Sequence, residues 1–203
     1  MYAIVEDNKI KQIITNPKSI VVGDVRYPAK IFQLWSQSEL NAIGIYEVIT
    51  DSTNFKDQAY YNNTNEEYNF ADNQVTRSWG TATPKRLEDE DAVDKDGENI
   101  LDDDGNQVIN YGLKTDKKKI VKQQASGLLE KTDWHNHKAL DDDTYTIPDN
   151  VKAYRANVRS KSNEMETQID ACTNVDELKA LYEYTRQEDG TQTRPLAEFP
   201  EEI

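Results

Sequence analysis

An acidic segment in the middle of the chain divides the sequence into parts that must fold separately. Between Glu88 and Asp104 there are ten acidic residues and one lysine. Charged side chains are almost never fully buried without a partner, so this segment cannot form a core of its own. The segment also contains a repeat, because residues 94–101 and 102–109 share the turn Asp-x-Asp-Gly followed by apolar residues. Such turns are typical of β-hairpins, and we interpret residues 85–113 as an acidic β-arm or a solvated linker.

The first 50 residues have the features of a small β-rich docking domain. Apolar runs at residues 2–6 and 9–14 flank the dipeptide Asp7-Asn8. Both turn residues tolerate a positive φ, so the pattern predicts a hairpin. Further short strands are expected at residues 20–22 and 45–49.

A capping pattern predicts one short helix inside this domain. Ser36 is followed three residues later by Glu39, the spacing of a capping box, and Gly44 stands where a helix often ends. We expect the helix over residues 37–43, with Trp35 packed ahead of it as a hydrophobic staple.

Residues 51–84 are rich in tyrosine and asparagine and are interpreted as a β-hairpin region. The expected turn lies at residues 62–65, with residues 68–70 leaving it and residues 75–79 as a possible third strand. A structural meander is the favoured interpretation. A carbohydrate-binding surface stays open as an alternative, formed by the aromatic residues Tyr60, Tyr61, Tyr68 and Trp79.

Beyond the acidic segment the apolar pattern changes to a helical period. Apolar residues recur at helical spacing over residues 120–129, and a clearer stripe starts after Pro148. Four members of that stripe are seven residues apart and share one face: Val151, Val158, Met165 and Cys172. A third helix is expected from Asn174, capped through Glu177 and ended by Gly190. We therefore predict an antiparallel helical module over residues 114–190, followed by an extended tail over residues 191–203.

Charge and composition exclude several classes of protein. The net charge is −14, which argues against nucleic acid as a partner because phosphate binding needs a cationic face. No apolar run approaches the ~18 residues of a membrane span, and residues 1–4 do not open a signal peptide. The one cysteine, Cys172, excludes an internal disulfide framework.

The sequence has no motif that supports catalysis, a cofactor or a metal site. There is no Gly-x-Ser-x-Gly, no glycine-rich phosphate loop and no catalytic Cys/His pair. His135 and His137 have only residues 141–143 as nearby further ligands, so solvent-facing imidazoles are expected. The Asp-Gly turns place Ala92 or Ile100 at the first ligand position of a helix-loop-helix calcium loop, so neither register fits. We expect a protein that is not an enzyme.

Four short patterns between residues 115 and 185 allow a comparison with a known family. They are Leu128-Leu129, Thr132-Asp133-Trp134, Ile147-Pro148, and a helical stretch with Tyr154-Arg155 and Arg159. Together they resemble the helical module of tailed-bacteriophage tail proteins of the tail fibre assembly or tail assembly chaperone family. Residues 25–46 also look like an N-terminal unit met in phage and prophage tail genes. Residues 135–138 depart from the family, which usually carries a tyrosine or an apolar residue after Thr-Asp-Trp.

The element pattern predicts an α+β fold, and the resemblance implies a bacteriophage tail protein with other tail proteins as partners, present in the host cytoplasm during assembly. Because the resembling module covers only about a third of the chain and the β-rich domain with its arm suits docking, we expect a structural component of the virion tail near the fibres or the baseplate. The alternatives are a fibre assembly chaperone absent from the mature particle and a carbohydrate-binding host-recognition module. A homo-oligomer is compatible with the sequence, whereas nucleic acid and membrane are not expected as partners.

Six residues are the candidates for partner binding: Trp35, Thr132, Asp133, Trp134, Arg155 and Arg159. Thr132 and Asp133 are good helix-capping residues, and Trp134 is expected to bury its ring against the next helix. Arg155 and Arg159 are one helical turn apart, so each is expected to pair with an acid such as Asp133 or Asp142, or to face a partner.

Overall fold

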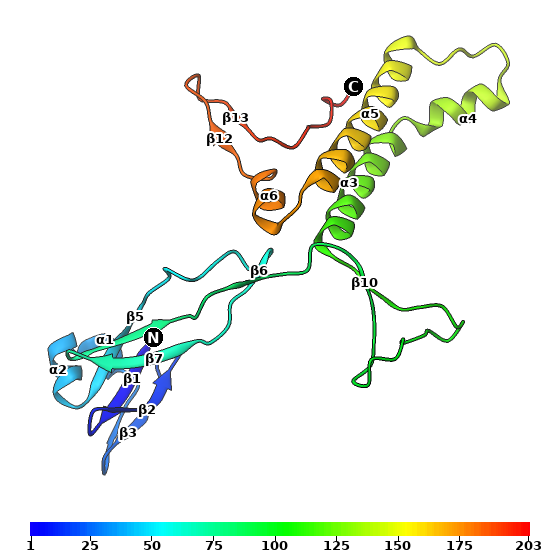
Figure 1. The fold of residues 1–203 in the computed structure, drawn as a ribbon. Coiled ribbons are helices and arrows are strands. Elements are labelled where there is room, and N and C mark those ends of the chain that lie inside the picture. The colour runs from blue at the N-terminus through cyan, green and yellow to red at the C-terminus, as the bar shows by residue number, and fades with distance from the viewer. The chain divides into compact units, whose positions relative to one another are not determined.

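A computed structural model describes all 203 residues and has an α+β fold, as the sequence predicts (Figure 1). The chain divides into two compact units, Met1–Pro84 and Lys85–Ile203, which we call the sheet unit and the helical unit. The division falls at the start of the predicted acidic arm. No helix is long and apolar enough to cross a membrane.

A five-stranded sheet organises the sheet unit, with the strand order β2-β1-β5-β8-β7. Its strands are β1 (Tyr2–Glu6), β2 (Lys9–Ile14), β5 (Ile45–Thr50), β7 (Glu67–Ala71) and β8 (Gln74–Ser78). All neighbours are antiparallel except β5 and β8. The predicted β1–β2 hairpin is confirmed, and its turn residues Asp7 and Asn8 have φ values of 51° and 58°.

Both faces of this sheet carry an apolar cluster, because alternate side chains of each strand point to opposite sides. One cluster joins Ile4, Ile14 and Ile45 to α1 (Ile31–Leu34) and α2 (Gln37–Ala42). The other face holds a second cluster, formed by Ala3, Val5, Val48 and Val75 with Ile10, Ile13, Tyr46, Tyr68 and Phe70 around them. The second cluster includes side chains from both edge strands, so the sheet curls around it.

The predicted short helix is confirmed as α2, and its capping box is complete. Ser36 Oγ accepts a hydrogen bond from the N–H of Glu39, and the Glu39 carboxylate accepts one from the N–H of Ser36. Gly44 follows α2 with a φ of +79°, and a Cβ there would lie 2.6 Å from the Val5 carbonyl oxygen. The predicted third strand is confirmed as β3 (Ile20–Val22), which pairs with β4 (Val25–Tyr27). The four-residue helix α1 had no signal of its own in the sequence.

The turn predicted at residues 62–65 is wrong. The hairpin instead joins β7 to β8 through Asp72 and Asn73, whose φ values of 50° and 58° fit a tight two-residue turn. Because β8 pairs with β5, residues on both sides of position 50 belong to one sheet. A second small pair, β6 (Tyr61–Asn62) with β9 (Thr83–Pro84), ends the unit.

The acidic segment forms a short arm of paired turns within the helical unit. Its base is β10 (Glu90–Asp91) paired with β11 (Ile109–Asn110). Three residues that follow one another at intervals of eight, Ala92, Ile100 and Val108, are joined in a ring by backbone hydrogen bonds. The N–H of Ala92 donates to Val108, that of Val108 to Ile100, and that of Ile100 to Ala92. The sequence repeat is therefore a structural repeat, with Gly97 and Gly105 at positive φ in its two turns.

The helical unit is built on two long antiparallel helices, α3 and α5, which lie side by side (Figure 1). Its helices are α3 (Leu113–Glu130), α4 (Asp133–Asp141), α5 (Asp149–Ala171) and α6 (Val175–Ala180). Antiparallel packing is evident because Lys118 near the start of α3 pairs with Asp170, while Leu129 near its end contacts Arg155. The predicted heptad stripe is confirmed, since all four of its residues are buried.

The third predicted helix is too long. Asn174 caps α6 by accepting from the N–H of Glu177, as expected, but α6 ends at Ala180. Gly190 instead lies in a hairpin turn between β12 (Thr185–Arg186) and β13 (Gln192–Thr193). The tail beyond is extended, as predicted, and it packs on the helices: Leu196 is buried and Phe199 contacts the core of Ala125, Tyr154 and Val158.

Candidate protein-interaction site

Arg155 organises the junction between α3 and α4. Its guanidinium donates to the Leu129 carbonyl (2.8 Å), to Thr132 Oγ1 (2.7 Å) and to Asp133 Oδ1 (2.7 Å). The last carbonyls of a helix have no partner inside it, so Arg155 on α5 supplies one for α3. The predicted ion pair between Arg155 and Asp133 is confirmed. Because Arg155 is 8% exposed, it joins the helices internally and does not face a partner.

Thr132 belongs to the same junction, but not as the helix cap that its residue type predicts. It immediately precedes α4, yet its hydroxyl makes no capping hydrogen bond to that helix. The hydroxyl donates to the Leu129 carbonyl at 3.0 Å and accepts from Arg155. Thr132 is thus a buried link between Arg155 and the end of α3.

Trp134 lies on the surface, contrary to the expectation that it is buried. Its exposed fraction is 53%, and α4 as a whole has no buried residue. The indole stacks on the His135 imidazole with ring centroids 3.7 Å apart, and His135 Nδ1 is hydrogen-bonded to the Tyr145 hydroxyl. We call Trp134, His135 and Tyr145 the aromatic cluster. Sequence analysis missed Tyr145, because it lies in an irregular segment with no periodic pattern.

Trp134 and His135 of the aromatic cluster border a hollow of about 390 Å³. Pro148 and Val151 line the same hollow, and so does the C-terminal residue Ile203. Leu140 at the far end of α4 is 81% exposed. A partly apolar hollow beside an exposed aromatic side chain is typical of surfaces that bind another protein.

Arg159 is exposed and makes no contact with the acids proposed for it. Its Nη1 atom donates to the Arg155 carbonyl oxygen at 3.4 Å. Asp142, one of the expected partners, is engaged by the hydroxyl and N–H of Thr144, which lower the pKa of its carboxyl group. Arg159 therefore has a guanidinium that is accessible on the surface of α5.

Trp35, the sixth candidate, belongs to the sheet unit. Its ring packs against the cluster beneath α1 and α2 and meets Tyr27 edge-on, with centroids 5.7 Å apart. The position ahead of α2 agrees with the predicted staple. Exposed apolar side chains occur nearby in sequence, with Leu34 at 75% and Val25 at 52% exposure.

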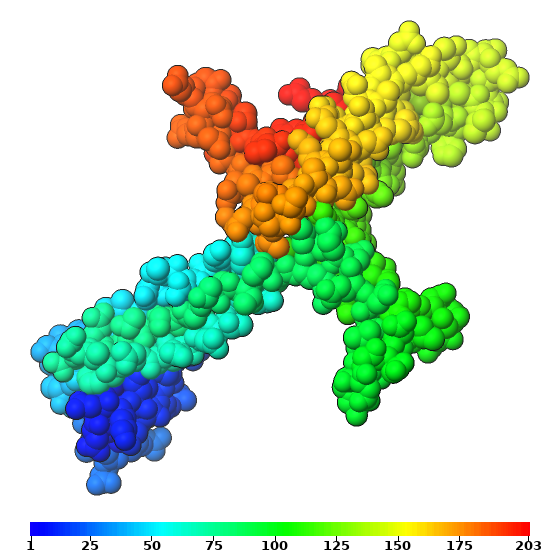
Figure 2. Space-filling view, in the orientation of Figure 1, coloured from blue at the N-terminus to red at the C-terminus, as the bar shows by residue number.

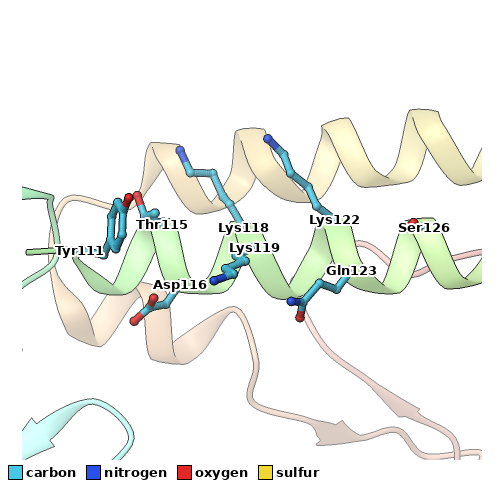
Figure 3. A pocket seen from close by; sticks show the side chains of 8 residues that line it. All are labelled: Tyr111, Thr115, Asp116, Lys118, Lys119, Lys122, Gln123 and Ser126. Carbon is cyan, nitrogen blue, oxygen red and sulfur yellow. The ribbon is translucent and has the colours of Figure 1, made fainter. Parts of the chain in front are cut away.

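Five lysines lie close together on α3, at positions 114, 117, 118, 119 and 122. Three of them form ion pairs within the helical unit. A hollow of about 660 Å³ runs along α3, and Figure 3 shows Lys118 and Lys122 projecting to one side of the helix and Lys119 to the other. Lys118 pairs with Asp170 at 2.7 Å, which raises the pKa of Lys118, and Lys122 pairs with Glu166 at 3.2 Å. Lys114 pairs with Glu88, so one lysine contacts the acidic segment.

The structure gives little support to a carbohydrate-binding surface. Tyr60 and Tyr61 are 5% and 3% exposed, so they cannot stack on a sugar. Trp79 is occupied by contacts with Phe55 and Arg77. The platform proposed from the sequence is therefore incomplete.

The titratable groups form no arrangement suited to metal binding. No group of three or more His, Cys, Asp or Glu side chains is placed to hold a metal ion. Cys172 is buried, and burial raises the pKa of its thiol, which makes the thiolate scarce at neutral pH.

Comparison with known proteins found no relative of this chain. No family model, no curated protein and no solved structure matches this chain.

Proposed function

We propose that this chain is a non-enzymatic bacteriophage tail protein, built into the virion near the tail fibres or the baseplate. The main support comes from the four short sequence patterns that resemble the tail-protein family. Leu129, Thr132, Asp133 and Arg155 come from three of those four patterns, and they meet in one hydrogen-bonded junction. If the resemblance arose by chance, there would be no reason for the matching residues to contact one another.

The surfaces support a role through protein–protein contacts. In the helical unit Trp134 and Leu140 of α4 are exposed. In the sheet unit Val21, Val25 and Leu34 are exposed on β3, β4 and α1. The edge strands of the curled sheet contribute to its own core, so these side chains are better docking candidates than the sheet edges. The expected partners are other tail proteins, first in the host cytoplasm and then in the virion.

Co-purification with particles tests the proposal. Intact phage is banded in a density gradient, and each fraction is assayed for this chain and for a major tail protein. A virion component is expected to follow the tail protein at a constant ratio, because tail symmetry fixes copy number.

A fibre assembly chaperone is the competing function, since the resemblance covers that family. A chaperone binds its client before the particle is complete and is then released. The chain would then be found bound to a fibre protein in infected-cell lysate and would be missing from banded particles. That result would replace the structural role by the chaperone role.

A further inference from the structure

The C-terminal segment, residues 194–203, lies as an extended peptide along the helices of its own unit. Leu196 is 2% exposed, and Phe199 packs against Ala125, Tyr154 and Val158 between α3 and α5. The space-filling view shows this segment, in red, against the yellow and orange surface of α5 (Figure 2). The helices thus form a groove with one site for leucine and one for phenylalanine.

The groove also binds the peptide backbone, chiefly through Gln168 of α5. The side-chain nitrogen of Gln168 donates to the Pro195 carbonyl at 3.0 Å, and its oxygen accepts from the N–H of Ala197 at 2.8 Å. Between these two bonds, the N–H of Leu196 donates to the Leu181 carbonyl at 3.0 Å. Hydrogen bonds to both sides of Leu196 hold the segment extended, which is how peptide-binding sites fix a ligand in register.

An ion pair adds a preference for an acidic end. Lys131, just after α3, binds the Glu202 carboxylate at 2.6 Å. The ligand that fits the groove is therefore an extended segment with leucine and phenylalanine three residues apart, followed by acidic residues.

We propose that this groove is a peptide-binding site and that, in assembled copies, it takes the C-terminal segment of a second copy of the chain in place of its own. The identity of the occupant follows from the segment already seated there, because a second copy carries the same side chains and makes the same contacts. Exchange of an identical segment is a low-cost route to an oligomer. The inference concerns the purified chain and holds whether or not the proposed tail function is correct.

The seated segment is not tightly enclosed, which favours exchange. At its start, a hollow of about 390 Å³ lies beside Pro195 and is lined by Ala171, Cys172 and Leu181. At its end, Ile203 borders the hollow next to Trp134. Glu198 and residues 201–203 are exposed. The segment makes the same contacts in the groove of its own chain and in the groove of a second copy. Its own groove is favoured only because the segment is covalently attached, which gives it an effective concentration on the order of millimolar.

A peptide-binding experiment tests the groove. The receptor is the chain truncated after Thr193, and the probe is a fluorescent peptide of residues 192–203. We expect saturable 1:1 binding to the truncated chain and at least tenfold weaker binding to the full chain, whose own segment competes. The peptide with Phe199→Ala should bind at least tenfold more weakly, whereas the matched peptide with Glu201→Ala should bind as the parent does. Equal binding of the Phe199→Ala and parent peptides would overturn the proposal.

A second measurement on the full chain tests exchange and does not need the truncated receptor to fold. Light scattering is recorded from micromolar to millimolar concentration for the full chain and for the double variant Leu196→Ala, Phe199→Ala. We expect a monomer that dimerises toward millimolar concentration, and a double variant that stays monomeric. A full chain that stays monomeric throughout, or a double variant that dimerises equally, would show that the segment serves only its own chain.

Discussion

The two units bury their apolar side chains in different ways. The sheet unit closes its core with neighbouring strands and two short helices, and the apolar clusters on the two faces of the sheet are both formed within residues 1–84. The helical unit depends on a segment at the far end of the chain, since Leu196 and Phe199 cover helices that begin at residue 113. Its α3–α4 junction is held by a buried arginine.

This difference shows where each unit has surface available for partners. A unit that completes its own core presents isolated exposed side chains such as Leu34. A unit that needs a peptide in a groove presents a site whose occupant can change. The predictions below test whether the units differ as described.

The largest effect is expected from removing the C-terminal segment. Truncation after Thr193 exposes the sites of Leu196 and Phe199 and should lower the unfolding free energy of the helical unit by about 3 kcal/mol. The sheet unit should be unaffected. Urea unfolding followed at 222 nm reports the helices, and the fluorescence of Trp35 and Trp79 in a Trp134→Phe background reports the sheet unit.

Truncation after Pro200 is the matched control for that experiment. It removes the exposed pair of Glu202 with Lys131 and keeps both apolar contacts, so it should change stability by less than about 1 kcal/mol. Equal losses for the two truncations would contradict the groove contacts.

The next effect concerns the two arginines on α5. Arg155→Ala removes the donor to the Thr132 hydroxyl, one donor to the Leu129 carbonyl and the ion-pair partner of Asp133, and should cost about 2 kcal/mol. Arg159→Ala removes an exposed side chain and should stay within about 0.5 kcal/mol. Urea unfolding followed by circular dichroism at 222 nm measures both changes in unfolding free energy. A larger loss for Arg159→Ala than for Arg155→Ala would show that the buried junction does not stabilise the unit.

Capping residues offer one matched pair across the two units. Ser36→Ala in the sheet unit and Asn174→Ala in the helical unit should each cost about 1 kcal/mol in their own unit. A cap substitution that destabilises the other unit equally would show that the units do not unfold separately.

The same caps predict a dependence on pH. Hydrogen bonds from Ser36 lower the pKa of Glu39, and those from Thr173 lower the pKa of Glu177. A carboxyl group whose pKa is lower in the folded state stabilises that state at pH values above its unfolded-state pKa of about 4.3. This stabilisation is lost as the pH falls through the folded-state pKa. The cost of Ser36→Ala, measured by urea unfolding, should therefore be smaller at pH 3 than at pH 6. An equal cost at both values would contradict the carboxylate's part in the cap.

A small effect is also expected at Trp134. A buried tryptophan replaced by alanine typically costs 3–5 kcal/mol, but this ring is about half exposed on a helix with no buried residue. Trp134→Ala should thus cost less than about 1 kcal/mol in urea unfolding at 222 nm. A loss above 3 kcal/mol would restore the interpretation of Trp134 as a core residue.

Local patterns predicted the elements that depend on local chemistry. Asp7-Asn8, the Ser36–Glu39 cap and the stripe through Val158 each behave as their residue types and spacing indicate. In each case the decisive interactions are within a few residues or repeat on one helical face.

Features that depend on distant contacts were not predictable in the same way. The choice of Asp72-Asn73 over residues 62–65 as the hairpin turn depends on the pairing of β8 with β5. Trp134 was expected inside because indole is large and apolar, but whether it is covered depends on where the neighbouring helices lie. Gln168 and Phe199 gave no sequence signal, since their roles appear only when the tail returns to α5.

Incorporation into particles tests the central claim, that this chain is a tail component docked through its sheet unit. The deletion must remove residues 1–84, because a cut at residue 50 would leave β8 without its partner β5. Phage lacking the gene is complemented with the full chain or with residues 85–203, and copies per banded particle are counted by mass spectrometry. The account predicts a fixed copy number for the full chain and none for residues 85–203, and circular dichroism of residues 85–203 checks that this fragment folds as helices. Incorporation of residues 85–203 at the full-chain level, or absence of the full chain from particles, would contradict it.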